Sequence, residues 1–192
     1  MIGFLKGIII SNSEHSLIMD VNGVGYLIRT PLPLLVSIKK EDEISLYIHT
    51  HVREDQITLY GFRENSDLFL FEKLIGVSGI GPKSALAMLS VHSPTSIASA
   101  VEREDVEALS HTPGVGKKTA QKIILELKGK LNHLLSGKEN DSTLEVRLAL
   151  EALGYSSKEV HDALQKIKID TPTGEKNKTT SALIKEALSQ LQ

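Results

Sequence analysis

The 192-residue sequence contains no cysteine. The chain can therefore form no disulfide, thiolate metal site or iron–sulfur cluster, and this residue usage suits a reducing cytoplasm. A run of about 18 apolar residues is also absent, so the sequence holds no candidate membrane-spanning helix. The first ten residues carry Lys6 inside an apolar run and no small-residue cleavage site follows, so we expect a strand there and not a signal peptide.

An excess of positive charge is missing as well, because the formal net charge is −2. That average argues against a nucleic-acid binder, but the charge is unevenly distributed. Residues 109–131 contain one acid, Glu126, and five lysines: Lys117, Lys118, Lys122, Lys128 and Lys130. This local surplus suits a contact with an anion. A lysine-rich helix taken alone is more often a solvated face.

Residues 1–63 have the pattern of an all-β domain. The clearest turn signal is Asn22-Gly23, a type I′ hairpin pair between alternating runs, and a longer crossing occurs near PLPLLVSIKKEDE. Five short strands in about 60 residues favour a small closed barrel of the OB-fold type. The apolar runs are Gly7–Ile10, Leu17–Val21, Gly25–Arg29, Ile44–Val52 and Ile57–Phe62.

Residues 64–135 predict short helices joined by glycine turns. Ser93-Pro94 has the form of an N-cap followed by proline at the first helical position. Apolar residues recur at helical spacing in two sets. The sets are Leu68, Phe71 and Ile75, and Ala120, Ile123, Ile124, Leu127 and Leu131.

Residues 136–142, SGKENDS, contain no apolar side chain and predict a flexible linker. Beyond it, Ser142-x-x-Glu145 and Ser156-x-x-Glu159 match the capping box that begins a helix, Gly154 is expected to end the first of these helices, and residues 181–191 supply a third. A three-helix domain over 143–192 has little room for a catalytic cleft, so protein binding is its expected role.

Two heptapeptides 35 residues apart, GIGPKSA at 79–85 and GVGKKTA at 114–120, share the pattern G-[IV]-G-x-K-[ST]-A. Each follows a short helical segment and opens another helix, so the pair predicts a duplicated helix–hairpin–helix. The predicted fold class is multidomain α+β. It comprises an N-terminal five-stranded OB-like barrel, a central all-α tandem helix–hairpin–helix domain and a small C-terminal three-helix (UBA-like) domain.

A glycine- and lysine-rich heptapeptide also suggests the phosphate loop of an ATPase, but the spacing is wrong. The Walker A motif requires a glycine five residues before Gly-Lys-[Ser/Thr]. For Gly116-Lys117 that position is His111, and Lys118 stands where Ser or Thr is needed. In the first copy a proline precedes the lysine, and neither copy follows a predicted strand. We therefore expect no nucleotide cofactor.

The alternative is a phosphate site made of backbone amides. Glycines at both ends of the turn allow a positive φ and a close approach to a ligand. The turn directs its N–H groups, and the positive end of the next helix, toward an anion. Such a site would bind DNA regardless of sequence, and two copies suggest paired contacts to one duplex across a minor groove. A single copy is explained equally well as a tight turn; two matched copies with lysines favour DNA.

The opening MIGFLKG, the segment HTHVREDQITLYGF, the two hairpins and LEALGY near the C-terminus together resemble the RuvA family of Holliday junction branch-migration subunits. The resemblance covers essentially the entire chain. It implies a non-catalytic, cofactor-free subunit that binds four-way DNA junctions as a homotetramer, or an octamer, in recombination and repair. It also implies two partners, the hexameric ATPase RuvB and the junction endonuclease RuvC.

The same resemblance assigns roles to the residues of the two hairpins. The glycines would supply closely approaching backbone, four lysines would supply charge to phosphates, and two hydroxyl residues would cap their helices or donate to phosphate. These candidate DNA-binding residues are Gly79, Gly81, Gly114 and Gly116; Lys83, Lys117, Lys118 and Lys122; and Ser84 and Thr119.

Glu54 and Asp55 are expected at the tip of a hairpin. For an arbitrary Glu-Asp pair, a soluble turn is the simpler explanation. In the family that the chain resembles, the matching acids form a central pin that faces the junction crossover. Four copies would place eight carboxylates there, and their repulsion would keep phosphates from the centre. No further acid cluster accompanies the pair in the sequence, so nothing indicates metal-dependent cleavage.

The resemblance further implies that the linker and the C-terminal domain bind the RuvB motor. Most of the candidate contacts must also form the core of a very small domain, so the pattern does not separate binding from scaffold. The candidates are Leu148, Leu150, Leu153, Tyr155, Leu164 and Ile167.

Three alternatives stand beside these expectations. His49 and His51 lie on one strand face but have no third ligand at suitable spacing, which favours packing or hydrogen bonding over a metal. A helix–hairpin–helix DNA glycosylase needs a catalytic Asp after the hairpin, but the first Asp beyond Gly116 is Asp141, in the predicted linker. A duplex-binding scaffold without junction preference would carry the same motifs.

Overall fold

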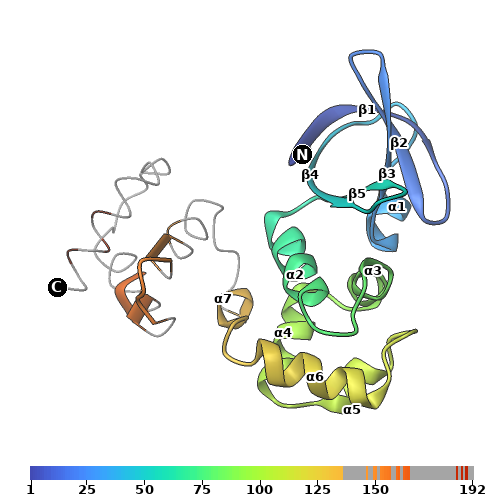
Figure 1. Ribbon diagram of the computed structural model, residues 1–192. Helices are drawn as coiled ribbons and strands as arrows, with labels where there is room; N and C mark the ends of the chain where they lie inside the picture. The colour runs from blue at the N-terminus through green and yellow to red at the C-terminus, as the bar shows by residue number, and fades with distance from the viewer. Residues whose placement is uncertain are drawn as a thin grey trace. The chain divides into compact units, whose positions relative to one another are not determined.

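The computed structural model describes residues 1–135 and, beyond them, 146, 149–150, 152–156, 159–160, 162–164, 185, 187 and 189. The chain divides into two compact units, Met1–Lys128 and Gly129–Gln192 (Figure 1). Within the described residues, no helix has the length and apolar character needed to cross a membrane.

Five strands of the first unit form a closed barrel in the order β1-β2-β3-β5-β4. β3 and β5 pair in parallel, whereas all other neighbours are antiparallel. The predicted OB-like barrel is confirmed, but the crossing before β4 contains a short helix, α1, that the sequence pattern did not reveal. The bounds are β1 Phe4–Asn12, β2 Ser16–Val21, β3 Val24–Arg29, α1 Leu32–Ser37, β4 Glu43–Val52 and β5 Ile57–Phe62.

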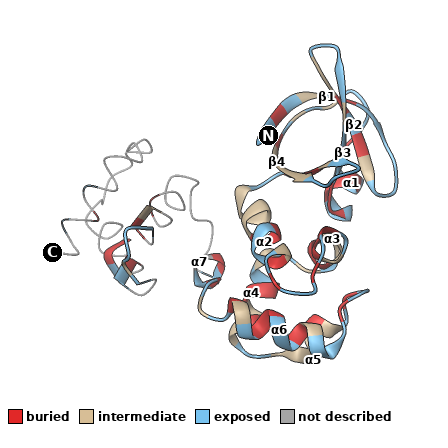
Figure 2. Ribbon diagram, in the orientation of Figure 1, coloured by how far each residue is buried: buried red, intermediate tan, exposed pale blue. Residues whose placement is uncertain are grey.

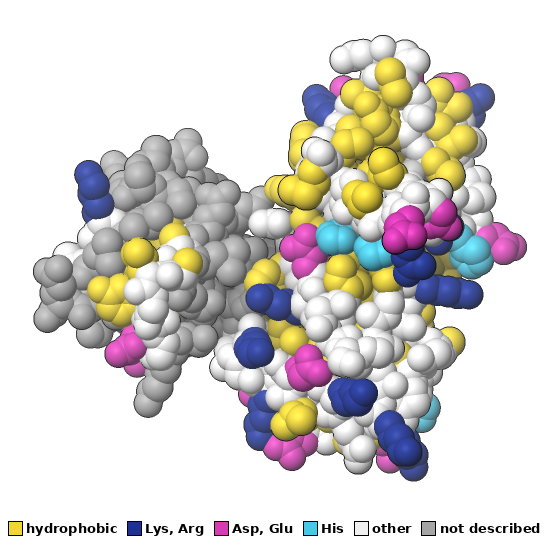
Figure 3. Space-filling view, viewed as in Figure 1, with side chains coloured by type: hydrophobic (Ala, Val, Ile, Leu, Met, Phe, Trp, Pro, Cys, Tyr) yellow, Lys and Arg dark blue, Asp and Glu magenta, His cyan; other side chains and the backbone are white. Residues whose placement is uncertain are grey.

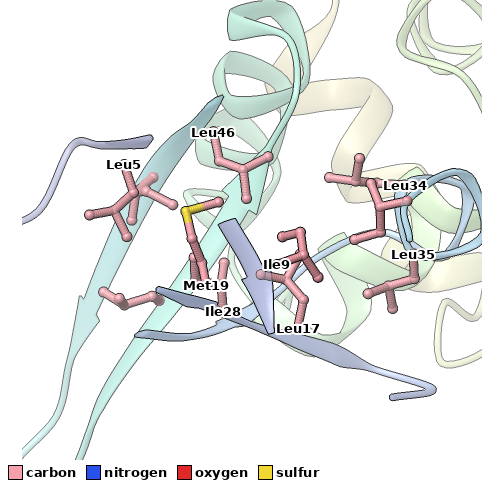
Figure 4. Close-up of a cluster of buried hydrophobic side chains, with 11 residues drawn as sticks. Leu5, Ile9, Leu17, Met19, Ile28, Leu34, Leu35 and Leu46 are labelled. Carbon is pink, nitrogen blue, oxygen red and sulfur yellow. The ribbon is translucent and has the colours of Figure 1, made fainter. Parts of the chain in front are cut away.

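The barrel interior is filled by alternate residues of the strands and closed by α1 (Figure 4). Leu17, Met19 and Ile28 are completely buried, and α1 adds Leu34 and Leu35 to the same cluster. The predicted type I′ hairpin is also present: Asn22 and Gly23 have φ angles of 53° and 86°, the positive values that this turn requires.

Five helices complete the first unit. Ser93 accepts a hydrogen bond from the Ser96 amide at 3.2 Å, which confirms the predicted N-cap. The predicted face of α6 is also confirmed, because Ala120, Ile123, Ile124 and Leu127 are buried (Figure 2), although the helix ends before Leu131. The bounds are α2 Asn65–Ile75, α3 Pro82–Val91, α4 Pro94–Glu102, α5 Val106–Ser110 and α6 Lys117–Leu127.

The predicted buried face of α2 needs a correction. Leu70, Phe71 and Leu74 are completely buried, whereas Leu68 and Ile75 are only half-buried. Phe71 is thus confirmed as a core residue, whereas Leu68 and Ile75 are not fully buried. α2 contacts both the barrel and α3, so its apolar residues occupy more of its circumference than a single face.

Aromatic rings join the barrel to α2. The Phe71 ring lies 4.9 Å from Phe62, 5.1 Å from Tyr60 and 5.4 Å from His49. His49 Nδ1 is also 3.0 Å from Glu72 Oε1. The expectation that the strand histidines serve packing and hydrogen bonding is confirmed. Within the described residues, no group of three His, Asp or Glu side chains has the arrangement of a metal site.

The described residues of the second unit include α7, Asn132–Leu135, and a small core of Val146, Leu150, Val160, Leu164 and Ala187. The capping box at Ser156 is present, because Ser156 N and Oγ donate to Glu159 Oε2 at 2.9 and 2.7 Å. These hydrogen bonds lower the pKa of Glu159. Gly154 has a φ of 97°, consistent with a helix end. The predicted linker at 136–142 and the box at Ser142 lie outside the described residues.

Candidate nucleic-acid interface

The two copies of the 35-residue sequence repeat also share the same backbone conformation. Residues 76–81 connect α2 to α3, and residues 111–116 connect α5 to α6. Both turns contain two successive hydrogen bonds from an amide to the carbonyl three residues earlier. The bonds are Val77 N to Leu74 O and Ile80 N to Val77 O, both at 3.0 Å, and Thr112 N to Leu109 O at 3.3 Å and Val115 N to Thr112 O at 3.0 Å. In both copies the turn connects one helix to the next. A Walker A loop instead connects a strand to a helix, so neither turn has the context of a phosphate loop of that type.

The two glycines of each turn differ in conformation. Gly79 and Gly114 have φ values of 92° and 84°, a region that other residues adopt only at a cost. Gly81 and Gly116 are extended N-cap residues with φ values of −97° and −83°, which any residue can adopt. The expectation of positive φ at both ends of the turn is therefore correct for the first glycine of each copy and wrong for the second.

Nothing in the part of the chain that the structure describes requires glycine at the second position. A Cβ placed on Gly81 or Gly116 would have no heavy atom within 4 Å. Between the glycines, Ile80 and Val115 are 6% and 3% exposed and anchor each turn in the helical core. Neither the backbone conformation nor the packing therefore requires glycine at these positions. The space that a side chain would fill outside the start of each helix is open.

The open space lies next to unsatisfied amides. No side chain caps α3 or α6, so the first N–H groups of both helices lack an intrahelical partner and carry the positive end of the helix dipole. Ser84 and Thr119 stand at the third helical position and do not cap, which corrects one of their two expected roles. Ser84 Oγ is 3.6 Å from the position a Gly114 Cβ would take, so the two hairpins adjoin.

The four candidate lysines, Lys83, Lys117, Lys118 and Lys122, are exposed. Among the ion pairs found in residues 1–135, none includes them. Lys128 differs, because it forms an ion pair with Glu104 that raises the pKa of the lysine. Figure 3 shows separate lysine and arginine side chains over the helical part of the first unit. The uncompensated charge of α6 therefore lies toward its N-terminal end, at the hairpin.

Glu54 and Asp55 occupy the tip of the β4–β5 hairpin, as expected. The chain reverses between Arg53 and Gln56, where Arg53 N donates to Gln56 O at 2.9 Å, and both acids are exposed. Neither has a positive φ, so the turn is not of the type I′ class seen at Asn22-Gly23.

The structure divides the candidate motor contacts. Leu150 and Leu164 are buried in the core of the second unit and Tyr155 packs against it. Leu153 is 64% exposed, so among the four described candidates it is the one free to contact a partner. Leu148, Ile167 and the glycosylase candidate Asp141 lie outside the described residues.

Sequence reasoning missed one surface beside the acidic tip. Val52 and Ile57 pair directly across the hairpin and are 67% and 70% exposed. Their signal was present as the apolar residues that flank REDQ, but alternation alone did not show that this pair lies beyond the barrel core.

A closed five-strand barrel followed by two adjoining, matched hairpins defines an OB-barrel protein with a tandem helix–hairpin–helix. Family descriptions match the chain in the same order: "RuvA N terminal domain" over residues 1–61, "SAM-like Helix-hairpin-helix tandem" over 71–130 and "RuvA, C-terminal domain" over 141–192.

Curated relatives agree with these family matches. A protein of Lysinibacillus sphaericus is 42% identical over 207 residues, covering 100% of this chain and 98% of the relative. One from Acholeplasma laidlawii is 40% identical over 186 residues, covering 96% and 99%. One from Oceanobacillus iheyensis is 43% identical over 182 residues, covering 88% and 90%. Each is named Holliday junction branch migration complex subunit RuvA. The chain belongs to the RuvA family.

The glycine pair of the second hairpin yields a prediction about stability. Replacing Gly114 with alanine forces a side chain into a left-handed conformation and should lower the free energy of unfolding by about 1–2 kcal/mol. Replacing Gly116, which is extended and open, should leave it unchanged within about 0.5 kcal/mol. Chemical denaturation of the two variants beside the unmodified protein measures the difference. Equal losses would show that Gly116 is also required by the fold.

Proposed function

We propose that this protein binds open four-way DNA junctions, independently of sequence, as a homotetrameric, non-catalytic subunit of a branch-migration complex. The observation that carries the proposal is the pair of adjoining hairpins, each with an uncapped helix start beside a glycine that the fold itself does not need. The names of the relatives support the same role.

The hairpins would bind the phosphate backbone. Amides at the start of α3 and α6 donate to phosphate oxygens, and Gly81 and Gly116 leave room for the backbone to approach. The four exposed lysines add charge, and the Ser84 and Thr119 hydroxyls are further candidate donors. Because none of these groups would contact a base edge, binding would not depend on the DNA sequence. Two adjoining hairpins suit the two strands that border one minor groove.

The acidic tips would act at the crossover. In a four-fold arrangement, Glu54 and Asp55 of each copy face the centre, where their charge keeps phosphates outward and guides strands between neighbouring arms. This role is electrostatic and steric, so the subunit holds and opens the junction without cutting it.

The second unit would recruit the complex partners in the cytoplasm. The ATPase RuvB is the proposed motor, with Leu153 as its exposed apolar contact on the described part of the unit, and the endonuclease RuvC is the proposed partner for resolution. ATP hydrolysis and strand cleavage then belong to the partners.

The alternative function is a duplex-binding scaffold with no junction preference, and one competition experiment separates the two. A labelled four-way junction bound to the full chain is challenged with unlabelled junction or with linear duplex of equal length and sequence at the same salt concentration. We expect the junction to compete better by a factor on the order of ten to a hundred. Equal competition would support the duplex-binding scaffold instead.

Lys118 tests the phosphate contacts. Replacing Lys118 with alanine should weaken junction binding and reduce the slope of log K against log salt by about 0.9, the value for one phosphate contact. Lys128→Ala is the matched control, because that lysine is also exposed but is paired with Glu104. Fluorescence anisotropy titrations at several salt concentrations give the slopes. An unchanged slope for Lys118→Ala would remove this lysine from the interface.

The acidic tip gives a separate prediction. The double variant Glu54→Gln, Asp55→Asn removes two charges while keeping the size of both side chains, so junction affinity should be retained or increased while the rate of branch migration or the preference for junctions changes. Glu14→Gln, an exposed acid in the β1–β2 connection, is the control. Loss of the folded barrel in the double variant, seen by circular dichroism, would make the pair a structural turn.

A further inference from the structure

The β4–β5 hairpin continues one face of the barrel interior beyond the barrel. Successive cross-strand pairs alternate between faces, so Thr50–Leu59 and Val52–Ile57 share a face. Thr50 ends the covered part, because its Oγ1 accepts from Ile2 N at 2.9 Å and donates to Ile2 O at 2.7 Å. Val52 and Ile57 form the next pair on that face, outside this N-terminal cover.

This outer pair is both apolar and exposed. Val52 and Ile57 keep 67% and 70% of their accessible surface, although the neighbouring pair on the same face includes Leu59, which is 7% exposed. Both side chains are β-branched and therefore stiff about χ1. The pair presents a small, rigid aliphatic surface directly behind the two acids of the tip.

The opposite face of the hairpin is braced. Arg53 Nε donates to His51 Nε2 at 3.1 Å, and the His51 ring packs edge-on to Tyr60 at 6.3 Å. Tyr60 in turn packs on Phe71 of α2. Burial, followed by the charges of Arg53 and His49, lowers the pKa of His51, which favours the neutral ring that can accept this bond. These contacts on the opposite face fix the hairpin strands, and with them the position of Val52 and Ile57.

Charge decides what can cover the pair. Glu54 and Asp55 lie between Val52 and Ile57 in the chain, each only two residues from the nearer member of the pair. Any partner at this surface therefore lies close to two carboxylates. A second hairpin packed directly on this pair would bring its carboxylates closer than tips that only face a common centre, and a DNA phosphate would meet the same repulsion. The base is the uncharged part of a nucleotide, and the faces of its ring are largely apolar. A base can therefore cover the pair where a phosphate cannot.

We propose that Val52 and Ile57 form a platform on which bases at the junction crossover pack after they lose a stacking neighbour. The inference rests on the proposed junction-binding function and assigns to the hairpin a base contact in addition to its charge. Apolar side chains that replace a stacking neighbour are a known means of holding unstacked bases. An aliphatic surface has no hydrogen-bonding group that could read a base edge, which suits contacts that must be remade at every step of migration.

The test uses the full chain and a four-way junction with 2-aminopurine at the crossover, since the fluorescence of this base rises when it unstacks. Wild-type protein should raise the signal at the crossover but not at a position within an arm. The double variant Val52→Thr, Ile57→Thr, which keeps β-branching, should reduce that rise by about half or more. Its junction affinity should stay within about threefold of wild type, because phosphate contacts dominate binding.

Two variants serve as controls. Ile57→Val keeps the surface apolar and should retain most of the rise. Val24→Thr alters a 52% exposed strand valine beside the Asn22-Gly23 hairpin and should leave the signal unchanged.

The proposal is overturned if the double variant gives the wild-type rise, or if wild type raises the crossover signal no more than the arm signal while still preferring the junction. It is also overturned if the double variant has a lower mass in DNA-free sedimentation, which would make the pair a contact between copies. Wild-type protein that fails to prefer the junction over duplex refutes the proposed function itself, so the two failures are distinguishable.

Discussion

The packing of Phe71 against the β4–β5 strands is the contact on which the candidate interface depends. Phe71 and Phe62 are completely buried, and Tyr60 and His49 complete the cluster. α2 therefore lies against the base of the acidic hairpin while its C-terminal end leads into the first helix–hairpin–helix turn. Folding, and not DNA, places the acidic tip relative to that turn, and such preorganisation removes an ordering cost from binding.

The two hairpins share a fold but offer different donors. α3 begins with Pro82, which has no N–H, whereas α6 begins with Lys117, which provides both an amide and a charge. Lys118 matches Lys83 of the first copy, but the second copy has a further lysine, Lys122, where the first has Ala87. Duplication thus supplies two similarly shaped turns, and the substitutions between the copies concentrate donors and charge at the second. A purely structural duplication would give no reason for that difference.

The elements with strong local signals were predictable from the sequence. The Asn22-Gly23 turn, the Ser93 cap and the 35-residue repeat each depend on a few neighbouring residues with defined backbone preferences. The features that failed depend on tertiary contacts. The sequence predicts only Phe71 of the buried α2 face, because this helix has two packing partners. The prediction of a positive φ at Gly81 is wrong, because a glycine in a sequence does not show which of its allowed conformations the fold selects. The exposure of Val52 and Ile57 depends on where the N-terminal segment stops covering the barrel.

A subunit that accompanies a moving junction must hold DNA without favouring one position along it. Amide and lysine contacts to phosphates are nearly equivalent at every base step, so advancing the duplex by one base pair exchanges one set of contacts for an equal set. In the proposed roles, the carboxylates at positions 54 and 55 would act on the uniform charge of the backbone, and the aliphatic platform would accept each base alike. All three kinds of contact keep the free energy of the complex nearly independent of sequence. If the proposed function holds, the hairpins can therefore bind the junction with high overall affinity. The free-energy barrier to advancing the DNA by one base pair stays small, so the motor works against little resistance.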